Sequence, residues 1–170
     1  MVLKSNQEHS FSTSSIIPVR VRNAQISDAK QLSELILENA EELVRPHYSE
    51  EQWNIFIKYY SEEVVAEKIG RQVVFIGEKE GLIVGTVALE DDFVVGVYTR
   101  LQNVGQGIGK LLMAHLENYA KDNGVMQLQL AASPTGLAFY YKNGWEKVKN
   151  FIIEYYGVGF EETLMIKHLR

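Results

Sequence analysis

The sequence predicts a mixed α/β fold (α+β mixed), with a mostly antiparallel central sheet of about six to seven strands and helices on both faces. Three observations support this prediction. Apolar, β-branched runs between residues 71 and 99 are separated by GEKEG and by Glu90-Asp91-Asp92, which is typical of an antiparallel meander. Amphipathic helical patterns stand before and after the meander, so both faces of a sheet can be covered. Glycines at residues 105–109 separate the meander from the next helix.

The 170 residues fit a single domain, which we expect at residues 16–170. Residues 1–15 are polar and rich in serine, and we expect them to form a flexible tail. The chain has no cysteine, which excludes disulfides and fits a reducing, cytoplasmic location. No apolar run approaches the length of about 20 residues that a bilayer requires, so we expect no membrane association.

The N-terminal elements are a strand followed by helices. IIPVRVRNA, at residues 16–24, alternates like a strand, and Ser27-Asp28 is a natural N-cap for the helical pattern AKQLSELILENAEEL. Pro46 ends this helix. Ser49 and Gln52 then have the spacing of a capping box for a second helix, EEQWNIFIKYY, and SEEVVAEKI predicts a third.

The C-terminal elements alternate between helix and strand. After the glycines, leucines at helical spacing predict a helix that Asp122-Asn123-Gly124 closes. MQLQLAA then predicts a strand, and SPTGLAFYYKNG predicts a short helix with Ser133 at its cap and Pro134 at its first position. The last two strands are expected in WEKVKNF and EETLMIKHL, at residues 145–151 and 161–169.

Charge and composition argue against two classes of function. The net charge of -5 and the pI of about 5.4 disfavour a nucleic-acid binder, which needs clustered lysine and arginine on one face. An acidic surface favours cationic partners instead. The four histidines show no ligand spacing, so we predict no metal site.

The glycines Gly105, Gly107 and Gly109 stand where a strand leads into a helix. A helix start carries unpaired N–H groups and partial positive charge, and the lack of side chains lets an anion such as a phosphate touch them. The alternative interpretation is that the glycines serve only a tight turn and helix packing. A Walker loop fails at Val104 and Leu111, and a dinucleotide fingerprint fails because Lys110 stands where its last glycine belongs.

Two segments resemble one family. GVYTRLQNVGQGIGKLLMAHLENYAK is similar to the cofactor-binding motif of the GNAT N-acetyltransferases, and ASPTGLAFYYKNGW is similar to the segment that follows it there. The family pattern is [RQ]-x-x-G-x-[GA]. It falls on Val104, Gly105, Gln106, Gly107, Ile108 and Gly109. Val104 departs from the arginine or glutamine of that pattern, which puts binding strength or loop geometry in doubt rather than the identity of the site.

The resemblance implies a GNAT-like fold and acetyl-CoA as cofactor. Residues 104–109 would bind the cofactor, and Lys110 would partly compensate for the arginine or glutamine that Val104 replaces. The strand at Val97, Tyr98 and Thr99 would splay from its neighbour and offer backbone groups to the pantetheine arm, as an added strand would. An opening is then expected between this strand and the one around residue 128. Ser133 replaces the asparagine of many members, and it either bonds to the cofactor arm or only caps a helix.

The same resemblance implies residues for acetyl transfer to an amine. Tyr140 occupies the position of the general acid that protonates the leaving thiolate, with Tyr141 as the alternative; without the family match, packing would be the preferred interpretation of both. The oxyanion would be met by a backbone N–H near Tyr98. Glu90 and Asp92 are the candidate bases, although acidic residues at a turn are more often solvated, and a water chain could replace them.

The acceptor is expected between the first two helical patterns, where aromatic residues gather. The candidate substrate-binding residues are His47, Tyr48, Trp53 and Tyr60. A hydrophobic cap over the sheet explains the same residues equally well. The sequence therefore favours an N-acetyltransferase for a primary amine of a small molecule or peptide, acting by direct attack in a ternary complex. A non-catalytic acyl-CoA sensor or partner module is the alternative, and the last strands could support a homodimer.

Overall fold

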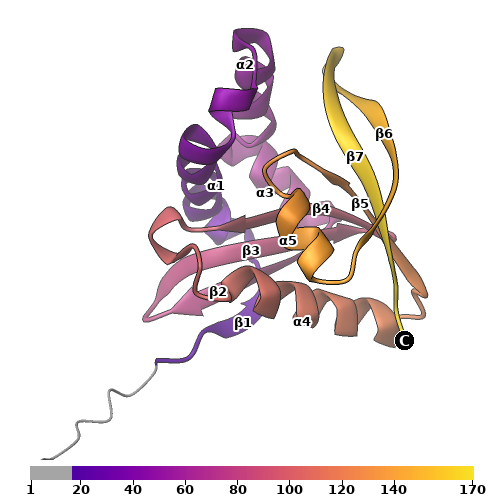
Figure 1. Ribbon diagram of the computed structural model, residues 1–170. Helices are drawn as coiled ribbons and strands as arrows, with labels where there is room; N and C mark the ends of the chain where they lie inside the picture. The colour runs from indigo at the N-terminus through magenta and orange to yellow at the C-terminus, as the bar shows by residue number, and fades with distance from the viewer. Residues whose placement is uncertain (1–16) are drawn as a thin grey trace, which may run out of the picture.

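The computed structural model describes residues 17–170, and the predicted tail at residues 1–15 lies outside them (Figure 1). The strands are β1 (Arg20–Asn23), β2 (Val73–Lys79), β3 (Leu82–Glu90), β4 (Phe93–Thr99), β5 (Gln127–Ala132), β6 (Glu146–Tyr155) and β7 (Val158–His168). The helices are α1 (Ala29–Leu43), α2 (Glu50–Tyr59), α3 (Glu62–Arg71), α4 (Ile108–Asp122) and α5 (Leu137–Lys142). Short 3-10 turns lie at Ile26–Asp28, Arg45–His47 and Leu101–Asn103.

The seven strands form one sheet in the order β1-β2-β3-β4-β5-β7-β6. Every neighbouring pair is antiparallel except β4 and β5, which run parallel and pair only at Phe93–Gln129 and Val94–Leu130. The predicted fold class and the meander of β2, β3 and β4 are therefore confirmed. The sheet is weakest between its two central strands, because only two residue pairs join them.

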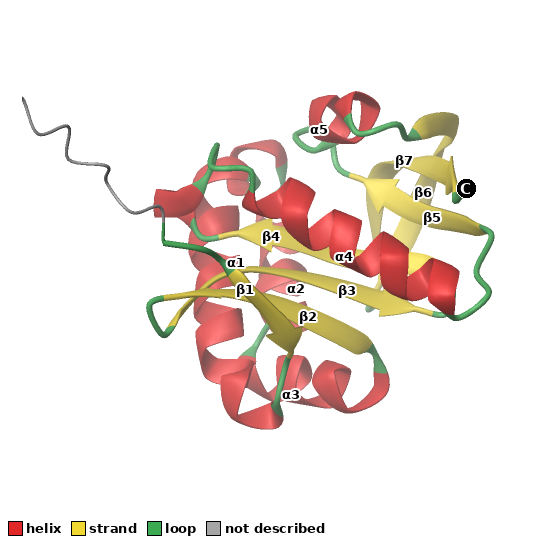
Figure 2. Cartoon of the chain, turned by 90° about the horizontal axis from the view of Figure 1, so that it is seen from below, coloured by secondary structure: helices red, strands yellow, loops and turns green. Residues whose placement is uncertain are grey.

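Helices cover both faces of the sheet, as the sequence predicts. Figure 2 shows α4 crossing one face, where Leu112 and Leu116 are fully buried, while α1 and α3 cover the other. Helix α4 comes very close to β3: a Cβ at Gly85 would lie 2.8 Å from Ile108 Cγ2 and 2.9 Å from Leu112 Cδ1. Glycine is therefore required there for the start of α4 to sit against the sheet.

The predicted cap of α2 is confirmed and that of α1 is not. The N–H of Gln52 donates to Ser49 Oγ, and the N–H of Ser49 donates to Gln52 Oε1, as in a capping box. At α1, Asp28 caps no helix amide. Its carboxylate instead accepts from the N–H of Gln25 at 2.7 Å and binds the Arg22 guanidinium through both oxygens. The ion pair with Arg22 on β1, which the capping pattern does not predict, thus takes the place of a cap.

Two C-terminal predictions are corrected by turn geometry. The short helix begins at Leu137 rather than at Pro134, because a turn in which the N–H of Gly136 donates to the carbonyl of Ser133 precedes it. The last two strands extend further towards each other than predicted, to Tyr155 and from Val158. Positive φ values at residues 156 and 157, 50° and 79°, make the two-residue turn typical of a tight hairpin.

None of the helices within residues 17–170 combines the length and the apolar character that crossing a bilayer demands. The same residues hold no group of three or more His, Asp or Glu side chains arranged to bind a metal ion.

Candidate active site

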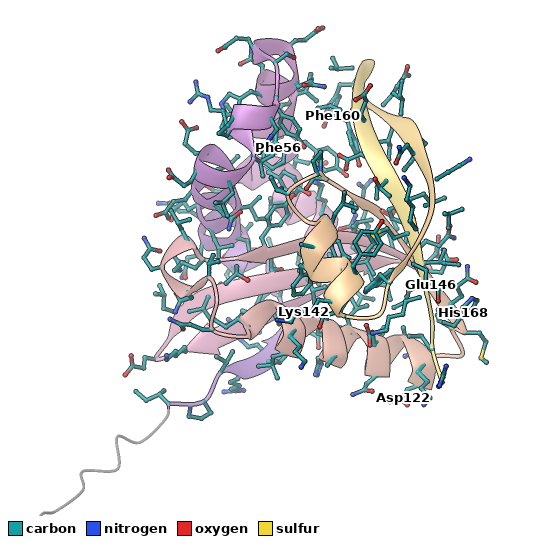
Figure 3. The ribbon with its side chains drawn as sticks, in the orientation of Figure 1. Phe56, Asp122, Lys142, Glu146, Phe160 and His168 are labelled. Carbon is teal, nitrogen blue, oxygen red and sulfur yellow. The ribbon has the colours of Figure 1, made fainter. Side chains whose placement is uncertain are left out.

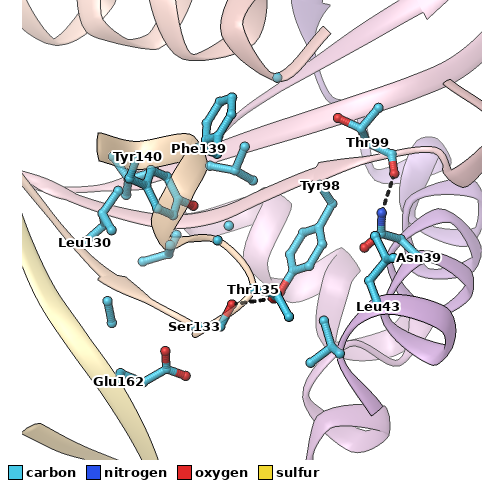
Figure 4. Close-up of a pocket in the computed structure, with 18 of the residues that line it drawn as sticks. Asn39, Leu43, Tyr98, Thr99, Leu130, Ser133, Thr135, Phe139, Tyr140 and Glu162 are labelled. Carbon is cyan, nitrogen blue, oxygen red and sulfur yellow. Dashed lines mark hydrogen bonds between the residues drawn. The ribbon is translucent and has the colours of Figure 1, made fainter. Parts of the chain in front are cut away.

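A cavity of about 650 Å³ opens where β4 and β5 part (Figure 4). The parting coincides with a β-bulge: Gly96 pairs with Ala88 and Val94 with Leu89, so Val95 is the extra residue. A bulge bends its strand and ends regular pairing, and bulges are enriched beside functional sites. The predicted opening between β4 and β5 is present, and the bulge accounts for its position.

The open edge of β4 offers backbone groups to the cavity. The N–H of Arg100 donates to the carbonyl of Val84 on β3, and inter-strand directions alternate along an antiparallel pair. The N–H of Tyr98 therefore also points to β3, whereas those of Val97 and Thr99 point to the open edge. Close to Tyr98, the backbone N–H groups that face the opening are therefore those of Val97 and Thr99.

The glycine loop lies at the other side of the opening. Gly105 and Gly107 have φ values of 83° and 78°, which a side chain would strain, and a Cβ at either would meet no atom within 4 Å. The first intrahelical bond of α4 runs from the N–H of Leu111 to the carbonyl of Gly107. The amides of residues 108–110 therefore precede the helical bonding pattern and are free for an anion.

Almost all of the predicted cofactor-binding residues line this one cavity. They are Val97, Tyr98, Thr99, Val104, Gly105, Gly107, Ile108, Gly109, Lys110, Ser133 and Tyr140. Gln106 does not line it, and its side-chain oxygen accepts instead from Asn103 Nδ2 at 3.2 Å. The hydroxyl of Ser133 is within 3.0 Å of that of Thr135 at the mouth of the cavity, and it caps no helix.

Tyr140 projects from α5 into the cavity, and its neighbour Tyr141 is half exposed and does not line it. A Cβ at Gly136 would lie 3.0 Å from the Tyr140 ring, so the small residue makes room for the phenol. Burial, and then the negative charge of Glu162, raise the pKa of Tyr140. The phenol therefore stays protonated at neutral pH and is able to donate.

The candidate bases Glu90 and Asp92 are not brought to the cavity. Glu90 Oε2 accepts from Gln72 Nε2 at 3.0 Å, and Asp92 Oδ2 accepts from Gln129 Nε2 at 2.9 Å. Both carboxylates sit at the β3–β4 turn, at the opposite end of β4 from the glycine loop. Their positions favour a structural role, tying the turn to its neighbours.

Only two of the four residues predicted to bind the acceptor line the cavity. Tyr48 and Tyr60 line the cavity, whereas Trp53 stacks on Phe56, with ring centroids 5.6 Å apart, and His47 is exposed. The aromatic end of the cavity is built across the opening from α2 and the β6–β7 hairpin, as the facing positions of Phe56 and Phe160 in Figure 3 show. Its residues are Tyr48, Phe56, Tyr60, Tyr98, Tyr155 and Phe160.

One residue of this end was not predicted from the sequence. Glu162 on β7 lines the cavity, and Figure 4 shows its carboxylate pointing into the space below Ser133 and Tyr140. Its Oε2 is buried and has no hydrogen-bond partner within residues 17–170. Burial raises the pKa of this carboxyl from 4.5 to about 7. The available signal was the strand alternation that places Phe160 and Glu162 on one face.

A sheet parted between its central strands, with a glycine-rich helix start on one side and a phenol on the other, defines a transferase that uses acylated coenzyme A. The chain belongs to the GNAT acetyltransferase family, since the family's profile, "Acetyltransferase (GNAT) domain", matches residues 44–167. Acetyl-CoA is the cosubstrate of this family. No curated protein sequence matches the chain closely enough to count as a relative.

Solved structures of the family have the same fold. A GCN5-related N-acetyltransferase from Rhodopseudomonas palustris superposes with a TM-score of 0.83 and 25% identity, over 91% of this chain and 98% of that one. The PaiA N-acetyltransferase of Thermoplasma acidophilum, in complex with coenzyme A, has a TM-score of 0.76 and 21% identity, over 89% and 99%. A putative acetyltransferase, YncA of Salmonella typhimurium, with its cofactor acetyl-CoA, has a TM-score of 0.62 and 16% identity, over 90% and 95%.

Proposed function

We propose that this protein transfers the acetyl group of acetyl-CoA to a primary amine by direct attack in a ternary complex. The observation that carries this proposal is the continuity of the cavity, which joins the glycine loop, the open edge of β4 and the aromatic end. A cofactor that spans the first two would present its thioester to the third. An acceptor bound there can attack without an acyl-enzyme, and the chain has no cysteine to form one by its thiol.

The cofactor would be held chiefly by the backbone. The amides of residues 108–110 would face the phosphates at the start of α4, and Lys110 would add a positive charge. The pantetheine arm would lie along β4 and pair with the carbonyl of Val97 and the N–H of Thr99, since the carbonyl of Thr99 already accepts from Asn39 Nδ2 at 2.8 Å. Ser133, across the opening, is placed to bond to the arm. Because these contacts are made mainly by backbone, Val104 in place of arginine or glutamine should reduce the affinity for acetyl-CoA only slightly.

Two groups would serve the chemistry. The N–H of Val97 would donate to the oxyanion that forms when the amine attacks the thioester carbonyl. Tyr140 would then give its proton to the departing thiolate, since its raised pKa keeps the phenol protonated until the thiolate forms. The tetrahedral intermediate collapses to the amide and free CoA, and the proton of the attacking nitrogen replenishes the phenol.

A non-catalytic acyl-CoA sensor is the second candidate, and Val104 favours it. This residue is 51% exposed and stands where the family pattern has arginine or glutamine, so the chain departs from the pattern of the enzymes in the loop that would bind the phosphates. A sensor would bind acetyl-CoA and never release free CoA, whatever amine is added.

The test combines calorimetric binding of acetyl-CoA with free-CoA release over a panel of amines. We expect wild type to bind and turn over, Tyr140→Phe to bind with a Kd within about twofold but to lose 100-fold or more in kcat, and the matched Tyr141→Phe to resemble wild type. Binding without turnover by any amine would leave the sensor, and absence of binding would contradict both candidates.

A further inference from the structure

Glu162 is the one carboxylate that reaches the aromatic end of the cavity within residues 17–170. It lies two residues from Phe160 on β7, so both side chains extend from the same face of the strand. No side chain of the described part of the chain donates a hydrogen bond to its buried Oε2. A buried carboxylate without a donor is unfavourable in the folded protein, and a bound donor would relieve it.

Within residues 17–170 no cation bonds to this buried oxygen. The lysines that line the cavity within residues 17–170 are Lys110 on α4 and Lys142 on α5, outside the aromatic end. Lys68 approaches Tyr60 at 4.1 Å from its ring centroid, and its Nζ donates to the carbonyl of Tyr59. The negative charge of Glu162 raises the pKa of four nearby phenols, those of Tyr48, Tyr98, Tyr140 and Tyr155.

The aromatic rings around Glu162 suit the same kind of ligand as the carboxylate does. Tyr48 and Phe160 meet edge to face with ring centroids 5.2 Å apart, and Tyr155 packs on Phe160 with centroids 5.5 Å apart, so these rings form one continuous aromatic wall. Ring faces attract cations, and a carboxylate completes the site with a charge-assisted hydrogen bond. A second carboxylate in the ligand would meet only negative charge and phenols.

We propose that Glu162 binds the ammonium group of the acceptor and accepts its proton, and that the acceptor is an alkylammonium with no carboxylate on the carbon that bears the nitrogen. This inference rests on the proposed acetyl transfer. The ammonium nitrogen would donate to Oε2, and the aromatic wall would hold the rest of the molecule.

The proton balance is closed. The carboxylate takes one proton from the ammonium, which leaves a neutral amine with a free electron pair to attack the thioester carbonyl. The C–S bond breaks as the intermediate collapses, Tyr140 protonates the sulfur, and the second proton of the nitrogen returns to the phenol. Glu162 releases its proton to solvent, so the reaction yields one amide, one free thiol and one proton. A carboxyl whose pKa is about 7 can both accept and release a proton near neutral pH.

The test uses the full chain, with 2-phenylethylamine and phenylalanine as probes that differ only in the carboxylate. Glu162→Gln is compared with Glu161→Gln. Glu161 is the exposed neighbour, and its side chain extends from the opposite face of β7. Acetyl-CoA affinity, amine binding to the CoA-bound protein at pH 8, and kcat/KM from pH 6 to pH 9.5 are measured for each variant.

We expect both variants to keep the Kd for acetyl-CoA within about twofold. In Glu162→Gln, kcat/KM for 2-phenylethylamine should fall at least 100-fold at pH 7 and then rise about tenfold per pH unit, as the free amine that it needs becomes available. In wild type the profile should level off above the pKa of Glu162, and phenylalanine should be at least 100-fold poorer.

The inference is overturned if the two variants have the same kcat/KM and pH profile, if phenylalanine is used as well as 2-phenylethylamine, or if the CoA-bound wild type neither binds nor acetylates the amine. Failure of wild type to bind acetyl-CoA is a different result, because it contradicts the proposed function itself.

Discussion

Replacing Glu162 by glutamine should stabilise the folded protein above neutral pH while it impairs catalysis. The pKa of the carboxyl is raised from 4.5 to about 7 in the folded protein because the side chain is buried. Each unit of pKa is worth about 1.4 kcal/mol, so the ionised carboxylate costs about 3 kcal/mol of unfolding free energy. Glutamine has nearly the same shape and carries no charge.

The sign of the effect fixes its pH range. Below about pH 4.5 the carboxyl is protonated in both the folded and the unfolded chain and contributes nothing. Between pH 4.5 and about 7 the unfolded chain loses the proton and the folded protein keeps it, so the stability of wild type falls as pH rises. The advantage of Glu162→Gln should therefore grow across that range and reach about 3 kcal/mol at pH 8.

Urea denaturation at several pH values between 4.5 and 8.5 measures this difference, with Glu161→Gln as the control. All other titrating groups are shared by the three proteins and cancel in the comparison. A difference between Glu162→Gln and wild type that is flat in pH would refute the argument. So would a variant less stable than wild type at pH 8, because the folded protein would then supply a partner for the carboxylate.

Two other residues allow equally direct tests. Burial lowers the pKa of Lys68 from 10.5 to about 7, so above pH 7 the unfolded chain binds more protons than the folded protein and the free energy of unfolding rises with pH. In urea denaturation, wild type should therefore gain about 2 kcal/mol of stability relative to Lys68→Met between pH 7 and pH 9. A stability difference between the two proteins that does not change with pH would contradict this. Gly107 has a φ of 78°, which asparagine and aspartate tolerate better than other residues with a side chain. Gly107→Asp should therefore weaken acetyl-CoA binding about tenfold relative to the isosteric Gly107→Asn in calorimetry, because only the aspartate carries a charge that repels phosphate. Equal Kd values for the two variants would show that the phosphates bind elsewhere.

The residues that the sequence predicts to bind the cofactor line one cavity, and there is a physical reason for this. A strand end, a glycine run and a helix start are consecutive in the chain, so the spacing of Gly105 and Gly107 already encodes the positive φ values and the free amides. The parting of β4 from β5 follows from a bulge at Val95, which no residue pattern announces. The family resemblance, and not the residues alone, supplied that expectation.

The acceptor half depends on contacts between distant segments and could not be predicted in the same way. In the sequence Glu161-Glu162 is typical of a solvated acidic pair, but in the folded protein Glu161 is exposed and Glu162 lines the cavity. Glu90 and Asp92 are acidic residues close together in the sequence, as a catalytic pair can be, yet their carboxylates accept hydrogen bonds from Gln72 and Gln129 away from the cavity. The proposal of Glu162 as the base rests on its tertiary position, which the spacing of charges along the sequence does not reveal.

One physical cause sets the pKa of both the proposed acid and the proposed base. Burial of the aromatic end raises the pKa of Tyr140 above its ordinary value, so the phenol holds its proton, and raises the pKa of Glu162 to about 7, so the carboxylate can take one. The ionised Glu162 raises the pKa of Tyr140 further, which keeps the acid protonated while the base is ready. When the base has taken the proton of the ammonium its charge is lost, and the pKa of the phenol falls towards that of the departing thiolate. The two groups are thereby coupled in the order that the reaction requires, and Glu162→Gln should lower the pKa of Tyr140 as well as remove the base.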